Sequence, residues 1–227
     1  MEKIKQLFIE QKYEELKAEI YQDSDFRQNP IKLRYLISAF YYSRDYQGTV
    51  SAIELLKPLE AKTAYSMLIN TEVTLGASAD LALGYIAQYL GQKMSGTEKN
   101  WAYFQKGLCF LAKNQKAEAV KILEKATPLE SDIMEAERHF FLRNSQDRYG
   151  NASTDFEKIN DLIIEARVNR DANLAKEARN KAVTANYGEA EYFATVILAK
   201  YLEAPEEKAV FNERFGHTTG TIYYQII

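Results

Sequence analysis

The sequence predicts an all-α protein built from antiparallel helical hairpins. Apolar residues recur at three- and four-residue spacing along almost the whole chain, and this is the period of an α-helix. The 227 residues include only 10 Gly and 4 Pro, too few for a turn-rich all-β sandwich. Short breakers such as Asn29-Pro30, Pro58 and Gly76 separate the periodic segments. Connections this short join antiparallel neighbours, so hairpins are expected.

The expected helices follow one another from the N-terminus with little sequence between them. Their ranges are 2–21, 31–43, 47–58, 62–75, 79–91, 98–113, 116–127, 132–147, 154–168, 171–184, 188–203 and 206–214. Thr154 and Glu157 have the spacing of a capping box, in which each side chain covers a free backbone N–H of the first turn. Only residues 219–227 look strand-like, because the Tyr and Ile side chains there favour extended backbone.

The composition excludes several classes of protein. The chain has 29 basic and 32 acidic residues, so the basic footprint of a nucleic-acid-binding protein is missing and no nucleic-acid partner is expected. No apolar stretch approaches the roughly 20 residues that cross a bilayer, and the N-terminus lacks the apolar core of a secretory signal. The single Cys109 cannot form an internal disulfide and, in an apolar run, is expected to be buried. We therefore expect a cytoplasmic protein without membrane contact.

Residues 100–131 contain a recognisable pattern of two helices. Small and aromatic residues occupy six positions of that pattern: Tyr103, Gly107, Phe110, Ala119, Leu123 and Ala126. This segment resembles the tetratricopeptide repeat, a 34-residue helix–turn–helix unit. Gly107 and Ala119 would let the two helices approach closely. Asn114 stands in the turn where the family usually has glycine, and Asn tolerates left-handed backbone.

The same template fits upstream at nearly constant spacing. Leu16, Thr49, Ala82 and Ala119 take corresponding places, at intervals of 33, 33 and 37 residues. The resemblance implies about four repeats over 1–131, of which the first and third are degenerate. Residues 132–227 are expected to be divergent helical hairpins and a C-terminal cap, continuous with the first part. The fold that the resemblance implies is a right-handed α-solenoid of antiparallel helix pairs with a concave inner face.

In the family, the first helix of each repeat lines the concave face. The residues that this register places there, and that we take as candidates for binding a partner, are Arg34, Ser38, Tyr41, Tyr42, Met67, Thr71, Trp101 and Phe104. Phe104 and Leu108 fit the core equally well, because a one-residue slip swaps groove and core. Tyr41 and Tyr42 fit the groove better. Phe40, Tyr41 and Tyr42 are consecutive on a helix, so their side chains cannot all face the seam between the paired helices.

A groove of this kind suits an extended peptide or an amphipathic helix with apolar anchors. The sequence thus favours a non-catalytic interaction module, an adaptor or assembly chaperone, with a protein or peptide partner. Chaperone-type members of the family clamp a terminal carboxylate with Lys and Asn. Only Arg34 is basic at those positions here, so that function is not expected.

Candidate catalytic groups are few. His139 and His217 have no second His or Cys nearby, so no metal site is expected, and no cofactor motif is present. Two alternatives stay open: a helical enzyme that uses a loop His217 or His139, and a structural homo-oligomer that associates through residues 219–227.

Overall fold

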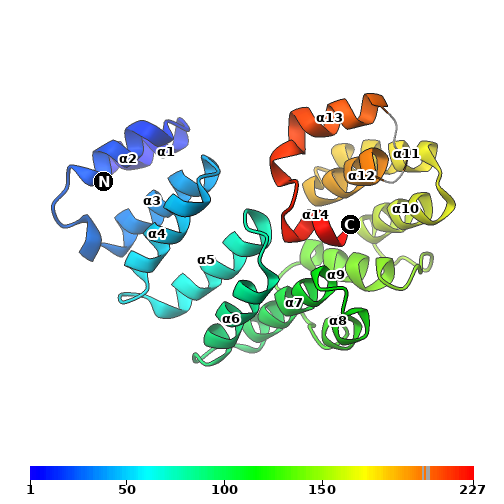
Figure 1. Cartoon of the computed structure of the whole chain (residues 1–227), viewed down its shortest axis with the longest axis horizontal. Coiled ribbons are helices and arrows are strands. Elements are labelled where there is room, and N and C mark those ends of the chain that lie inside the picture. Colours follow the sequence, from blue (N-terminus) through cyan, green and yellow to red (C-terminus); the bar gives the residue numbers. More distant parts are fainter. Residues whose placement is uncertain (201, 203–204) are drawn as a thin grey trace. The chain divides into compact units, whose positions relative to one another are not determined.

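The computed structural model describes residues 1–200, 202 and 205–227, and these residues form fourteen α-helices, two short 3₁₀ helices and no strand. The all-α prediction is confirmed. The chain divides into two compact units, Met1–Lys93 and Met94–Ile227 (Figure 1). The change of character predicted at residue 131 therefore falls inside the second unit, and a continuous solenoid stays a prediction.

The first unit is a series of helices that pack in chain order. They are α1 (Glu2–Ile9), α2 (Tyr13–Tyr21), α3 (Pro30–Tyr42), α4 (Tyr46–Leu56), α5 (Ala61–Thr74) and α6 (Ala79–Leu90), with a 3₁₀ turn at Phe26–Gln28. The hairpins α3–α4 and α5–α6 make the most extensive contacts. Their seams bury aliphatic side chains such as Leu33, Leu36 and Ile53. The core of this unit is mostly aliphatic.

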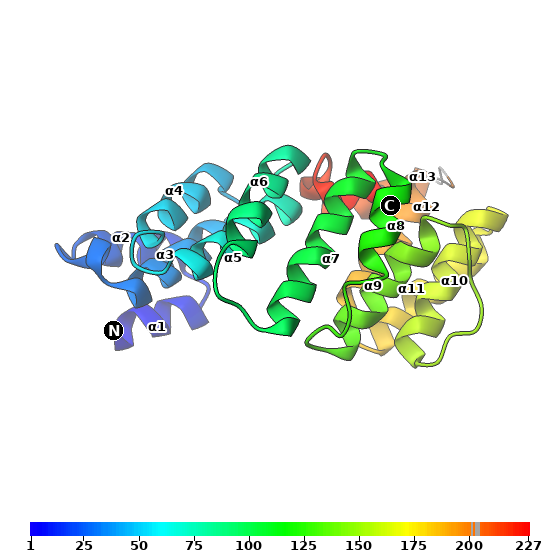
Figure 2. The ribbon, with the colours of Figure 1, turned by 90° about the horizontal axis from the view of Figure 1, so that it is seen from below.

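The second unit holds the remaining helices. They are α7 (Gly96–Ala112), α8 (Lys116–Leu123), α9 (Asp132–Asn144), α10 (Asp155–Asn169), α11 (Ala172–Thr184), α12 (Gly188–Lys200), α13 (Pro205–Phe215) and α14 (Ile222–Ile226), with a 3₁₀ turn at Gly216–Thr218. α9 and α10 lie side by side (Figure 2). Aromatic rings fill the centre of this unit: Phe140 stacks on Phe193 with centroids 4.5 Å apart, and Phe141 meets Phe193 edge-on.

The close approach expected between the helices over residues 98–127 is present. A Cβ atom placed on Gly107 would lie 2.6 Å from Leu123 Cδ2, closer than any real contact. Ala119 and Cys109 are fully buried, as predicted. Ala175, Ala178 and Ala182, the small-residue stripe of α11, are buried as well. Small side chains therefore set how closely the helices of the second unit approach one another.

One turn recurs at four hairpins. Gln11, Arg44, Asn114 and Asn186 each have φ between 52° and 60° and directly follow the C-cap of a helix. At each turn the left-handed residue and the next one donate backbone hydrogen bonds to carbonyls of the preceding helix, for example Asn114 N to Leu111 O at 2.9 Å and Gln115 N to Phe110 O at 2.8 Å. This is the Schellman pattern, which satisfies carbonyls left free at a helix end. The left-handed conformation inferred for Asn114 is confirmed.

Two predicted elements are wrong. The single helix expected over 2–21 is broken, because Gln11 adopts left-handed backbone between α1 and α2 without a Gly or Pro to announce it. The strand-like tail is the short helix α14, in which Thr221 Oγ1 accepts from Tyr224 N. Burial of Ile222 and Ile227 against the unit overrides the β-propensity of the segment.

Candidate functional site

A concavity of about 300 Å³ opens between α3 and α5 in the first unit. Its lining combines apolar, hydroxyl and amide side chains from these two helices: Ile37, Ser38, Tyr41, Tyr42, Ser66, Met67, Asn70 and Thr71. The volume suits one or two side chains of a ligand rather than a whole peptide.

Polar groups at the concavity are held by one another. The Tyr41 hydroxyl lies 2.8 Å from Thr74 Oγ1, and Asn70 Nδ2 donates to the Tyr41 oxygen at 3.5 Å. Met67 and Ile37 supply apolar surface beside them. The concavity therefore combines apolar surface with hydroxyl and amide groups that bond one another.

Tyr42 connects the concavity to a surface cluster of aromatic rings. It is 56% exposed and stacks on Tyr13 with centroids 5.8 Å apart and an interplanar angle of 17°. Tyr41 meets it edge-on at 5.6 Å, and Phe8 lies 6.0 Å away. These contacts hold the Tyr42 ring in place while leaving it accessible, which is the situation of an interface anchor.

Five of the eight predicted binding residues line this concavity: Ser38, Tyr41, Tyr42, Met67 and Thr71. Of these, Thr71 is only 2% exposed, so its side chain belongs mostly to the core. Arg34, one turn earlier on α3, pairs with Glu60. Trp101 is half-buried on α7, in the second unit.

Phe104 was placed wrongly as a groove residue. It is 1% exposed and packs 6.4 Å from Phe141, because its face of α7 points into the aromatic core. Leu108, one turn later, is fully buried too. The core alternative weighed for both residues is therefore correct.

Sequence reasoning missed three lining residues, Ile37, Ser66 and Asn70. Ser66 precedes Met67 and Asn70 precedes Thr71 on α5. Ile37 precedes Ser38 on α3. Extending each predicted helical face by one neighbouring position would have found all three.

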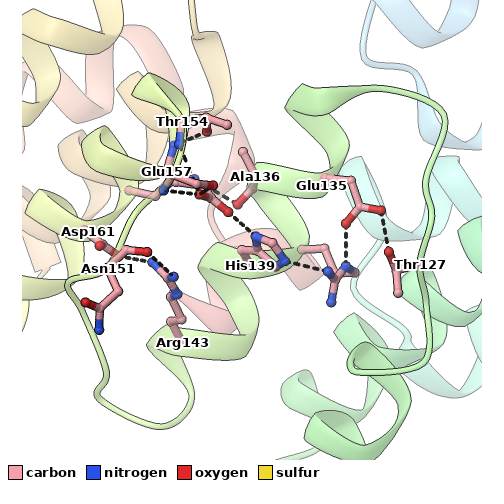
Figure 3. Close-up of polar contacts among 12 residues, drawn as sticks. Thr127, Glu135, Ala136, His139, Arg143, Asn151, Thr154, Glu157 and Asp161 are labelled. Atoms are coloured by element: carbon pink, nitrogen blue, oxygen red, sulfur yellow. Dashed lines mark hydrogen bonds and ion pairs between the residues drawn. The ribbon is translucent and has the colours of Figure 1, made fainter.

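His139 belongs to a polar network between α9 and α10 (Figure 3). Its Nδ1 bonds Glu157, and its Nε2 lies 2.6 Å from Arg138 Nη2. Arg138 is buried and also donates to Leu123 O at 2.9 Å and to Glu135 Oε2 at 2.8 Å. With the guanidinium donating to Nε2, the ring proton sits on Nδ1. Both ring nitrogens are thus engaged, so His139 links two helices.

The same network fastens the loop between α9 and α10. Glu157 accepts from Ser153 N at 2.7 Å and completes the predicted capping box with Thr154. Asp161, one turn later, accepts from Arg143 at 2.7 Å and from Gly150 N at 2.8 Å. Burial disfavours the charge on Glu157, but the hydrogen bonds from Ser153, His139 and Thr154 outweigh it and lower its pKa to about 2.

A larger groove, of about 730 Å³, runs along α10 and α11. Its apolar floor includes Ile159 and Leu162. Lysines at its rim are paired with neighbouring acids: Lys158 with Asp155 at 2.8 Å and Lys181 with Glu177 at 2.7 Å. The charges of the rim are largely neutralised within the groove itself, so no charge preference for a ligand follows.

His217 is exposed in the 3₁₀ turn Gly216–Thr218 and is not near His139 in sequence. Within residues 1–200, 202 and 205–227, no group of three or more His, Cys, Asp or Glu side chains is placed to hold a metal ion. Over that same part of the chain, no helix has the length and apolar character needed to cross a bilayer.

Comparisons with protein families, with curated proteins and with solved structures find no match to this chain.

Proposed function

We propose that this protein is a non-catalytic interaction module that binds a segment of a protein partner in the concavity between α3 and α5. The partner segment is an extended peptide or one face of a helix with an apolar anchor. Within that proposal the chain acts as an adaptor or assembly chaperone in the cytoplasm, built as a tetratricopeptide-like solenoid.

One observation carries the proposal. Five residues that the tetratricopeptide-like register assigns to the concave face, on α3 and α5, line a single concavity. Tyr42 and Met67 offer accessible apolar surface there, and tyrosine is among the residues that most often dominate binding energy at interfaces. Met67 has a flexible side chain that adapts to ligands of irregular shape.

The recurring turns support the repeat architecture. The interval from Gln11 to Arg44 is 33 residues, which is one repeat of about 35 residues. The intervals from Arg44 to Asn114 and from Asn114 to Asn186 are 70 and 72 residues, which is two repeats each. Leu16, Thr49, Ala82 and Ala119, the fourth residue after the N-cap of a hairpin's second helix, are all fully buried. This recurrence is what a chain of helix–turn–helix repeats requires.

Peptide selection tests the proposal. The immobilised full chain is panned against a displayed library of random 12-residue peptides, and the Kd of each enriched peptide is measured by calorimetry. The double substitution Tyr42→Ala with Met67→Ala should raise Kd at least tenfold, because each removes accessible apolar contact surface.

The matched control is Tyr21→Ala. Tyr21 is 52% exposed on α2 of the same unit and does not line the concavity. This variant should bind the enriched peptides as the wild type does. Peptides that bind the double variant with unchanged Kd, while its helical circular dichroism is intact, would show that the concavity is not the binding site.

A further inference from the structure

The C-terminal helix α14 packs against other helices of the second unit. Figure 1 shows it beside α9 and α12, and it also contacts α7. Tyr223 is the residue that it inserts: its ring lies 5.7 Å from Phe141, edge-on, and 6.3 Å from Phe193, stacked. The helix thus covers an aromatic face that would otherwise meet water.

The Tyr223 hydroxyl contacts a buried carboxyl group. Its hydroxyl donates to Glu137, which is 6% exposed on α9. Glu137 has no cationic partner in the part of the chain that the structure describes. The titratable groups that face it from the other elements are Tyr223 on α14, Glu189 on α12 and Tyr187 just before α12.

The surroundings of Glu137 favour its neutral form. Burial raises its pKa from 4.5 to about 7; the hydrogen bond from Tyr223 opposes this rise, and the Glu189 carboxylate adds to it. If α14 leaves, water reaches Glu137 and its pKa returns towards 4.5. The docked form therefore binds more protons between pH 4.5 and 7, so docking weakens as pH rises through that window and levels off above it.

Other contacts also hold α14: it packs on α7, Ile222 and Ile227 are buried, and the Tyr224 ring lies 5.6 Å from Phe211. It has five residues, too short for a helix to persist on its own. Lys200 Nζ donates to Tyr224 O at 3.2 Å, and its ammonium lies 4.9 Å above the Tyr224 ring. A cavity of about 230 Å³ remains beside the end of α14, and polar side chains such as Asn114, Asn144 and Arg167 line it. The end of α14 therefore borders a polar cavity.

We propose that the face formed by Phe141, Phe193 and Glu137 is a docking surface whose resident occupant is the chain's own C-terminal helix, and that ionisation of Glu137 releases this occupant. Glu137 is the group that responds to pH, and α14 is the segment that covers the face. Release exposes two aromatic rings and a carboxylate, which fits a partner segment that carries an aromatic residue with a hydrogen-bond donor, as Tyr223 does. This device lies wholly in the second unit and is independent of the concavity between α3 and α5.

Amide hydrogen exchange of the full chain tests the proposal, with rates corrected for the intrinsic effect of pH. Protection of the amides in 222–227 should fall about tenfold or more between pH 5.5 and pH 8.5, since each unit of pKa shift corresponds to a tenfold change. The α3 amides of the first unit serve as the internal reference and should keep their protection.

Glu137→Gln separates the switch from general pH effects, because its amide oxygen still accepts from Tyr223 but cannot ionise. Protection of 222–227 in this variant should be equal at the two pH values. Tyr223→Phe should lower protection at both pH values while keeping the trend. Equal protection in the wild type at pH 5.5 and 8.5, or an unchanged trend in Glu137→Gln, would overturn the proposal. If Glu137→Gln does not fold, Glu189→Gln decides: it should make the fall with pH smaller, and an unaltered fall would count against the switch.

Discussion

The two units place their aromatic side chains differently. The first has an aliphatic core and carries tyrosines at its surface, with Tyr42 open beside a concavity. The second stacks aromatic rings inside. Both units bury charged groups: Lys32 and Glu72 in the first, and Glu137, Arg138 and Glu157 in the second. The difference indicates where each proposal is tested: the binding proposal in the first unit, where the Tyr42 ring is accessible, and the pH proposal in the second unit, where Glu137 bonds Tyr223 beside the aromatic core.

Phe193→Ala should give the largest loss of stability, and this loss should be confined to the second unit. Phe193 is fully buried and contacts Phe140, Phe141 and Tyr223, so its loss should destabilise the unit by about 3–5 kcal/mol. Urea unfolding followed by circular dichroism measures the loss, and hydrogen exchange assigns it. The expected result is lost protection in α9 and α12 with α3 and α4 unchanged. Equal loss in both units would mean that they unfold as one. Phe110→Ala, half-buried on α7, is the control and should cost less.

Glu157→Gln should have an intermediate effect with a defined pH dependence. The pKa of Glu157 is about 2 in the folded chain against an ordinary 4.5, so its stabilisation is full above pH 4.5 and disappears as pH falls through 2. At pH 7 the variant should be less stable by about 1–3 kcal/mol, because buried hydrogen bonds lose their charged acceptor.

Urea unfolding at pH 7 and at pH 3 checks this effect, and the gap between variant and wild type should narrow at the lower pH. A gap of the same size at both pH values would contradict the role given to Glu157. The sign is opposite to that of Glu137, whose neutral form is the stabilising one.

Asn114→Ala should lower stability by a smaller amount, and this loss measures the contribution of the left-handed turn residue. Asn114 has φ 58°, and left-handed backbone costs an alanine roughly 1 kcal/mol. The thermal midpoint should fall accordingly, while Asn114→Gly should not lower it. Lys113→Ala is the matched control, because Lys113 has φ −83°. A control as damaging as Asn114→Ala would show that the turn geometry is not the cause.

Lys158→Ala should have the smallest effect. Lys158 pairs with Asp155 at 2.8 Å at the rim of the α10–α11 groove, where both side chains are largely in solvent. Water and salt screen such pairs, so no measurable change in Tm is expected. A clear fall in Tm, reversed by Lys158→Arg, would mean that the rim of this groove is more than a solvated surface.

Most of the fold could be predicted from the local periodicity of apolar residues and from the positions of small residues. Most helix ranges followed from spacing, whereas the buried Ala119 and the left-handed Asn114 followed from the resemblance to the tetratricopeptide repeat. The break at Gln11 did not, because nothing in that side chain prefers left-handed backbone and only the packing of α1 on α2 imposes it.

The candidate site also contains residues that the sequence could predict and residues that it could not. Residues on α3 and α5 could be assigned by helical face, whereas Phe104 depended on a register of one residue that sequence spacing cannot settle. The contact between Glu137 and Tyr223 joins residues 86 apart, and no local pattern predicts it. The helical form of the tail depends on the same long-range packing.

The most direct test of the binding surface is a map of backbone amide NMR shifts, recorded while a library-selected peptide saturates the full chain. The account predicts that the shifted amides cluster on α3 and α5, around Ser38, Tyr42, Met67 and Asn70. Shifts that cluster instead along α10 and α11, with those of α3 and α5 unmoved, would contradict it.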